Sequence, residues 1–110
     1  MIVEDDPFIA MDLEDTFEAE GYIILGPFAD VESGLEFLKN DVPDFAMLDY
    51  NLGRETSIPL ARTLQKQDIP YVFLSGQAEQ VVMSHDILAR PVIAKPFVPE
   101  QLIELVENSI

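Results

Sequence analysis

The sequence contains no cysteine, so disulfide bonds and thiolate metal sites are excluded. Long hydrophobic runs are also missing, and without about 18 consecutive apolar residues a membrane span is not expected. Basic residues are scarce: 6 lysines and arginines stand against 21 aspartates and glutamates, for a net charge of -15. Binding of nucleic acid or of an anionic membrane through a basic face is therefore not expected. We expect partners that are proteins or cations.

The length and the hydrophobic content indicate one folded unit. A chain of 110 residues with 48% hydrophobic residues can bury a single core of ordinary size, so we expect one domain over 1–110 without an output domain. The opening residues, "MIVEDDPF", have no basic flank and do not form a signal peptide. We therefore expect a cytoplasmic protein.

Short apolar runs alternate with amphipathic segments along the chain, which is typical of strands alternating with helices. Polar or turn-forming residues bound each run, and a long polar loop is expected after Asp49. The five expected strands are "MIV" (1–3), "YIILG" (22–26), "DFAMLD" (44–49), "PYVFLS" (70–75) and "VIA" (92–94).

Helix starts are marked by aspartates that can cap a helix and by prolines that suit its first turn. Only a short or irregular helix is expected over 77–90, and His85 within it is expected to be a surface residue. The four clear starts fall at Asp6-Pro7, Asp30, Pro59 and Pro99.

Strands that alternate with helices predict βαβ units and a mostly parallel sheet that is buried on both faces. We expect a doubly wound, five-stranded parallel sheet in the flavodoxin-like order 2-1-3-4-5, with helices on both faces. Ligands of such sheets bind outside the carboxyl ends of the strands. The residues that end each apolar run are therefore the candidates for a site.

Those strand ends carry a selective set of side chains: Glu4, Asp5, Asp49, Ser75 and Lys95. Clustered carboxylates repel one another unless a cation lies among them, and their hard oxygen atoms suit Mg²⁺. Asp49, alone at the end of the central strand, is the best nucleophile for a phosphoryl group. Lys95 could pair with the phosphate, and the Ser75 hydroxyl could donate a hydrogen bond to it.

The motifs "IVEDDP", "MLDYNLG", "FLSG" and "AKPF" together resemble the receiver domain of two-component response regulators over essentially the whole chain. "FLSGQA" further resembles the Phe-Ala-Thr-Gly-x-Tyr motif of an alphaproteobacterial, often single-domain subfamily, although Leu74, Ser75 and Ala78 replace its Ala, Thr and Tyr. The resemblance implies a phosphorelay in which a histidine kinase or a histidine phosphotransfer protein phosphorylates the domain. Dimerisation on phosphorylation stays open.

The resemblance also implies residue roles. Glu4 and Asp5 match the acidic metal-binding pair, and Asp49 matches the phospho-acceptor that shares the Mg²⁺. The backbone carbonyl of Asn51 would be a further metal ligand. Ser75 matches the hydroxyl switch residue, and Lys95 matches the lysine that contacts the phosphate.

Two positions keep alternative functions open beside the phosphorylated receiver domain. Val92 stands three positions before Lys95, where receivers usually have an aromatic switch residue, so a phosphorylation-independent pseudo-receiver that docks on a histidine kinase is one alternative. An Mg²⁺-dependent phosphatase with an aspartyl nucleophile ranks last, because Asn51 occupies the position of its usual general acid. We expect a signalling domain rather than a turnover enzyme. On the first helix, Phe8, Met11 and Phe17 could present a docking surface for a partner helix, although core packing is the expected use of Phe17.

Overall fold

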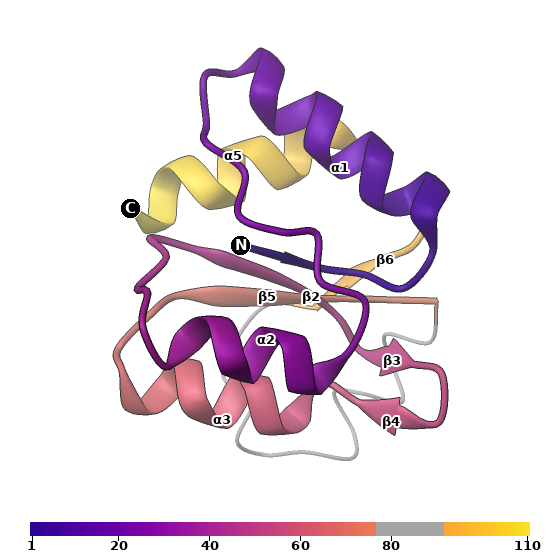
Figure 1. Cartoon of the computed structure of the whole chain (residues 1–110). Helices are drawn as coiled ribbons and strands as arrows, with labels where there is room; N and C mark the ends of the chain where they lie inside the picture. The colour runs from indigo at the N-terminus through magenta and orange to yellow at the C-terminus, as the bar shows by residue number, and fades with distance from the viewer. Residues whose placement is uncertain (77–91) are drawn as a thin grey trace.

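A parallel sheet lies between two layers of helices in the computed structural model, which describes residues 1–76 and 92–110 (Figure 1). Its strands run in the order β1-β2-β5-β6. They are β1 (Ile2–Val3), β2 (Ala46–Asp49), β5 (Tyr71–Ser75) and β6 (Val92–Ala94).

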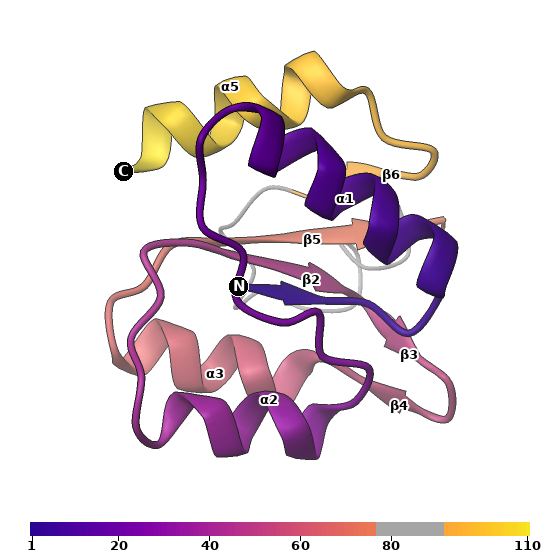
Figure 2. The ribbon, with the colours of Figure 1, turned by 45° about the horizontal axis from the view of Figure 1, so that its top comes forward.

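Two pairs of helices cover the sheet, one pair on each face (Figure 2). The first pair is α1 (Pro7–Ala19) and α5 (Pro99–Ser109), and the second is α2 (Val31–Leu38) and α3 (Ile58–Lys66). No helix within the described residues is long and apolar enough to cross a membrane. The α/β class, the parallel sheet and the helices on both faces are confirmed.

Alternate residues of each strand enter two separate cores, because successive side chains of a strand point to opposite faces. Val3, Leu48 and Phe73 pack in the cluster under α2 and α3, with Leu60 and Leu64 of α3. On the other face, a second cluster lies under α1 and α5 and contains Ile2, Met47, Val72, Leu13 and Leu102. Burial on both faces explains why the strands appear in the sequence as continuous apolar runs.

The prediction of a regular strand over 22–26 is wrong. The edge position beside β1 is instead held by an irregular segment, which makes one isolated bridge, between Val3 and Phe28. Backbone N–H groups of Ile2 and Phe28 still bond to the carbonyls of Leu25 and Ile2, at 3.0 and 2.9 Å. Gly26 has a φ of +100° and Pro27 lacks an N–H group, so the regular ladder is interrupted. The segment keeps the predicted place in the order without forming a strand.

The predicted helix starts are confirmed. The Asp6 carboxylate accepts hydrogen bonds from the N–H groups of Phe8 and Ile9, and the Asp30 carboxylate accepts one from Ser33. Prolines occupy the first turns of α1, α3 and α5. The helix expected over 77–90 and the surface position expected for His85 lie outside the described residues.

The polar loop predicted after Asp49 is instead a small antiparallel hairpin, β3 (Asn51–Leu52) and β4 (Glu55–Thr56). Gly53 turns the chain with a φ of +68°, a conformation that favours glycine. A carboxylate oxygen of Glu55 accepts a hydrogen bond from the N–H of Val31 at 3.2 Å and so ties the hairpin to the start of α2. The sequence did not indicate this pairing, because the segment is polar and both strands are only two residues long.

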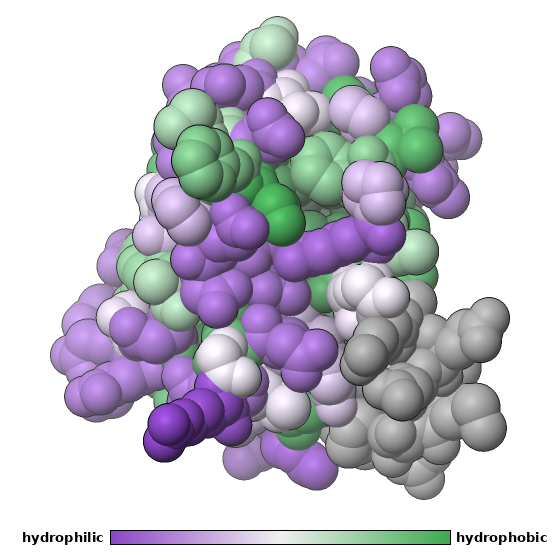
Figure 3. Space-filling model, turned by 90° about the vertical axis from the view of Figure 1, so that its right-hand side faces the viewer, coloured by the Kyte–Doolittle hydropathy of each residue, from purple (hydrophilic) through white to green (hydrophobic). Residues whose placement is uncertain are grey.

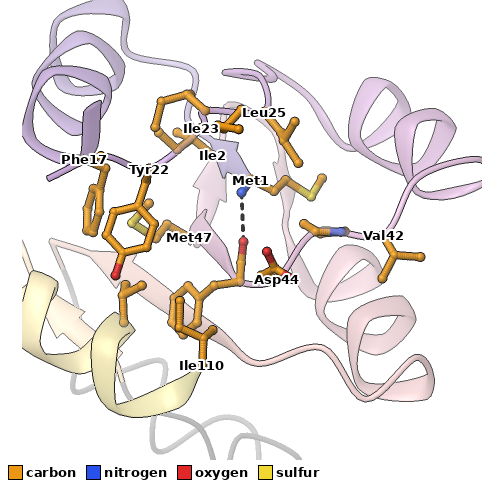
Figure 4. A pocket seen from close by; sticks show the side chains of 15 residues that line it. Met1, Ile2, Phe17, Tyr22, Ile23, Leu25, Val42, Asp44, Met47 and Ile110 are labelled. Carbon is orange, nitrogen blue, oxygen red and sulfur yellow. Dashed lines mark hydrogen bonds between the residues drawn. The ribbon is translucent and has the colours of Figure 1, made fainter. Parts of the chain in front are cut away.

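An apolar pocket of about 460 Å³ lies at the amino-terminal ends of the strands. Figure 4 shows Phe17 and Tyr22 together on one side of it, and Met47 and Ile110 also line it. The amino group of Met1 donates a hydrogen bond to the Phe45 carbonyl at 2.8 Å there (Figure 4). The pocket is therefore at the opposite end of the sheet from the polar strand ends.

Candidate phosphoryl-acceptor and metal site

The carboxyl ends of the four parallel strands bring the predicted polar residues to one edge of the sheet. Glu4 follows β1, Asp49 ends β2, Ser75 ends β5 and Lys95 follows β6. Figure 3 looks onto this end of the molecule and shows hydrophilic residues gathered across its middle. The expectation that these strand ends meet is confirmed.

Three carboxylates and one ammonium group gather at this edge, and the ammonium group contacts two of the carboxylates directly. Oxygen atoms of Glu4, Asp5 and Asp49 lie within 4.8 Å of one another. Lys95 Nζ is 2.8 Å from Glu4 Oε1 and 3.1 Å from Asp49 Oδ1. Glu4 and Asp49 are only 3% and 6% exposed, whereas Asp5 is exposed to solvent. The cluster is therefore buried on the sheet side and open on the side of Asp5.

The burial and the like charges change the ionisation of this cluster. Burial raises the pKa of Asp49 to about 7, helped by a hydrogen bond with Glu4 and by its charge, while Lys95 opposes the shift. For Lys95, burial lowers the pKa, but hydrogen bonds and charge interactions with Glu4 and Asp49 outweigh burial and raise it overall. Lys95 therefore stays positively charged beside the two acids.

The donor set fits a hard divalent cation. All three carboxylates offer oxygen atoms, which Mg²⁺ and Ca²⁺ prefer to nitrogen or sulfur ligands, and the three can converge on one ion. Asn51 lies in β3, where it pairs with Thr56, and its side chain is exposed. Its carbonyl as a metal ligand stays a prediction.

The two switch candidates are both placed on neighbouring strands. Ser75 is buried and lies opposite Ala94 in the ladder, and its carbonyl accepts the N–H of Lys95 at 3.0 Å. Val92 pairs with Phe73 and is partly buried. Ser75 is thus next to the lysine along the sheet edge, while its switching role and that of Val92 stay predictions.

One feature of the site was not expected from the sequence, the contact between Lys95 and Glu4. Lys95 was predicted to face a phosphate, yet its shortest contact is with Glu4. The other Glu4 oxygen, Oε2, accepts the backbone N–H of Asp6 at 3.2 Å. Opposite charges at the ends of two strands were the only available signal, and they do not identify which acid is the closer partner.

The fold and the site together define a class of domain: an open α/β sheet whose parallel strands bring acids and a lysine to their carboxyl edge. The chain belongs to the response regulator receiver domain family, which it matches over residues 1–107. This match confirms the family resemblance.

Relatives of known name and solved structures agree with the family assignment. The transcriptional regulatory protein PdtaR of Mycobacterium tuberculosis is 30% identical over 113 residues, which cover 100% of this chain and 55% of PdtaR. The chain thus spans about half the length of that relative. The solution structure of SdrG from Sphingomonas melonis is 36% identical with a TM-score of 0.81, covering 96% of this chain and 90% of SdrG. PhyR from Brucella abortus is 26% identical with a TM-score of 0.85, covering 99% of this chain and 46% of PhyR.

Proposed function

We propose that this receiver domain accepts a phosphoryl group on Asp49 from a histidine kinase or a histidine phosphotransfer protein. An oxygen of the ionised Asp49 carboxylate attacks the phosphorus of the donor phosphohistidine and forms a phosphorus–oxygen bond. The nitrogen–phosphorus bond breaks, its electron pair stays on the imidazole nitrogen, and that nitrogen takes up a proton from water. Bound Mg²⁺ would neutralise negative charge on the acids and on the incoming group. Glu4, Asp5, Asp49 and the carbonyl of Asn51 would hold it.

The observation that carries this proposal is the setting of Asp49. The side chain of Asp49 is 8% exposed, lies at the end of the central strand pair, and has an ammonium group 3.1 Å away. A buried acid with a lysine and two further acids beside it is not needed to cap a turn. The same groups are suited to hold a phosphoryl group next to a cation.

Phosphorylation would add a charge of about -1.5 to -2 at Asp49. Lys95 and the buried Ser75 are the neighbouring donors that would turn toward this charge. Val92 cannot supply the rotation of an aromatic ring, so we expect a smaller rearrangement at the end of β5. The output would be a change in protein contacts.

Docking of the phosphodonor would use the start of α1. Phe8 and Met11 are 79% and 56% exposed, and they stand one helical turn apart close to Glu4 and Asp5 in the chain. An apolar pair of this spacing fits the face of a partner helix. Membership of the Phe-Ala-Thr-Gly-x-Tyr subfamily and a cytoplasmic location belong to the same proposal, and the "FLSG" motif at the end of β5 supports the subfamily.

The proposal is tested by intact mass after incubation with acetyl phosphate, with and without Mg²⁺. We expect the wild type to gain about 80 Da only when Mg²⁺ is present, through one phosphoryl group. Asp49→Ala should gain nothing, whereas Asp44→Ala, which removes an exposed acid before β2, should gain as the wild type does. A gain in Asp49→Ala, or none in the wild type, would contradict the assignment.

A phosphorylation-independent pseudo-receiver is the second candidate, and Val92 at the switch position is the observation that favours it. It would bind a histidine kinase equally well with and without acetyl phosphate. A phosphatase would instead turn over nitrophenyl phosphate. Asn51 argues against this function, because its side-chain amide cannot act as the general acid.

A further inference from the structure

The apolar pocket at the amino-terminal ends of the strands has no part in the proposed function. Its volume of about 460 Å³ falls within the usual range for small-molecule sites, roughly 300 to 1,000 Å³. Phe17 and Tyr22 line one side of it, with their rings edge to face and the ring centroids 5.6 Å apart (Figure 4). The pocket therefore has the size and the aromatic wall of a small-molecule site.

Large aliphatic side chains that are exposed to solvent also line this pocket. Ile23 is 87% exposed, Val42 is 74% exposed and Ile110 is 58% exposed. They come from three separate parts of the chain: the edge segment over 22–28, the residues before β2, and the residue after α5. A single exposed aliphatic residue needs no explanation, but three around one apolar pocket mark a surface that a ligand can cover.

The charged groups of the pocket favour a cationic ligand. Among the described residues that line it, Asp44 has the only charged side chain, and it is exposed. The Met1 amino group donates a hydrogen bond to the Phe45 carbonyl in the same pocket. Burial lowers the pKa of this amino group to about 6, and the nearby charge of Asp44 opposes the shift. At about pH 7.5 the amino group is therefore mostly neutral and leaves Asp44 unpaired there.

Further acids around the pocket act in the same direction. Glu20, Asp41 and Glu107 are exposed, and each is next in the chain to a residue that lines the pocket. The net charge of -15 adds to this local negative potential. An anionic ligand would be repelled from this end of the molecule, whereas a cationic group would be attracted to it.

We propose that this pocket binds a small organic cation, in which an apolar body carries an ammonium group. The apolar body would pack against Phe17, Tyr22 and the exposed aliphatic side chains, and the ammonium group would pair with Asp44. A concave pocket between several elements suits a small molecule better than the flat surface of a protein. The site is at the end of the sheet opposite Asp49, so ligand binding here goes beyond phosphoryl acceptance.

The test is fluorescence titration of the intact chain with two matched probes at about pH 7.5. Dansylcadaverine has an apolar fluorescent ring system and a primary ammonium group, and N-butyl dansylamide has the same ring system without the charge. We expect the wild type to bind the cationic probe about three- to fivefold more tightly, as one exposed ion pair allows. Asp44→Asn should remove this preference. Asp12→Asn, which neutralises an exposed acid of α1 outside the pocket, should keep it.

The apolar contact is tested by Ile23→Ser. Because Ile23 is so exposed, we expect this variant to fold as the wild type does, and circular dichroism checks it. It should bind both probes about threefold or more weakly, since apolar contact area is lost. Val98→Ser is the matched control, because Val98 is 53% exposed but does not line the pocket, and its affinities should equal those of the wild type.

Three results would overturn the inference. The first is no binding of dansylcadaverine to the wild type at about 1 mM. The second is equal affinity for the two probes, or a preference that persists in Asp44→Asn. The third is a dimer in sedimentation analysis that Ile23→Ser dissociates, because a second copy of the chain would then cover the pocket. Phosphorylation of Asp49 is measured separately by mass, so either proposal can fail without the other.

Discussion

Ionisation of Asp49 opposes folding, because the pKa of this carboxyl group is raised in the folded protein. Its pKa is about 7 in the fold, because of burial and the neighbouring Glu4, against 3.8 as the ordinary value. The folded state therefore retains a proton that the unfolded chain releases, and the free energy of unfolding falls as the pH rises from about 4 to about 7. Above pH 7 this contribution is constant.

Asp49→Asn removes that ionisation and should stabilise the protein more at pH 8 than at pH 5. We expect the gain in unfolding free energy to be about 1 to 2 kcal/mol larger at pH 8. Urea unfolding at the two pH values measures it, with Asp44→Asn as the control for an exposed acid. A gain of the same size at both pH values would show that Asp49 is ionised throughout.

At the scale of the elements, the edge segment over 22–28 packs its backbone so closely against β1 that a side chain at Gly26 would disturb the contact. Gly26 has a φ of +100°, and a Cβ placed there would lie 2.8 Å from the Ile2 carbonyl oxygen and 2.9 Å from the Phe28 nitrogen. Both neighbours belong to the backbone that joins the segment to β1. They cannot withdraw without breaking that junction.

Gly26→Ala should therefore lower the unfolding free energy by about 2 to 4 kcal/mol, from strain in φ together with the clash. The matched control is Gly21→Ala, because Gly21 has a similar φ of +90° but nothing within 4 Å of an added Cβ. That control should lose only about 1 kcal/mol. Equal losses in chemical denaturation would mean that the contact with Ile2 is unimportant.

At the scale of the whole molecule, negative charge dominates. With a net charge of -15, and ion pairs in the described residues limited to those of Lys39 and Lys95, the folded chain repels itself. Raising NaCl from about 20 mM to about 200 mM should increase the melting temperature by about 2 to 5 °C, because salt screens exposed charges. Calorimetry without Mg²⁺ measures this, and a lower melting temperature in salt would show that favourable pairs dominate.

Much of this arrangement could be predicted because parallel strands give simple rules. Burial on both faces made the strands visible as apolar runs, and the meeting of their carboxyl ends placed Glu4, Asp49 and Lys95 together. Features that depend on contacts between distant residues could not be predicted. The choice of Glu4 as the closer partner of Lys95 and the hydrogen bond from Val31 to Glu55 are of this kind.

The irregular segment over 22–28 also affects how the protein behaves among copies of itself. A long, flat edge strand presents unpaired N–H and C=O groups on which another chain can add a strand. Here the backbone bends at Gly26, Pro27 offers no N–H, and the apolar Ile23, 87% exposed, lies on a backbone that is not a strand. This edge of the sheet is thus a poor template on which another copy of the chain could add a strand.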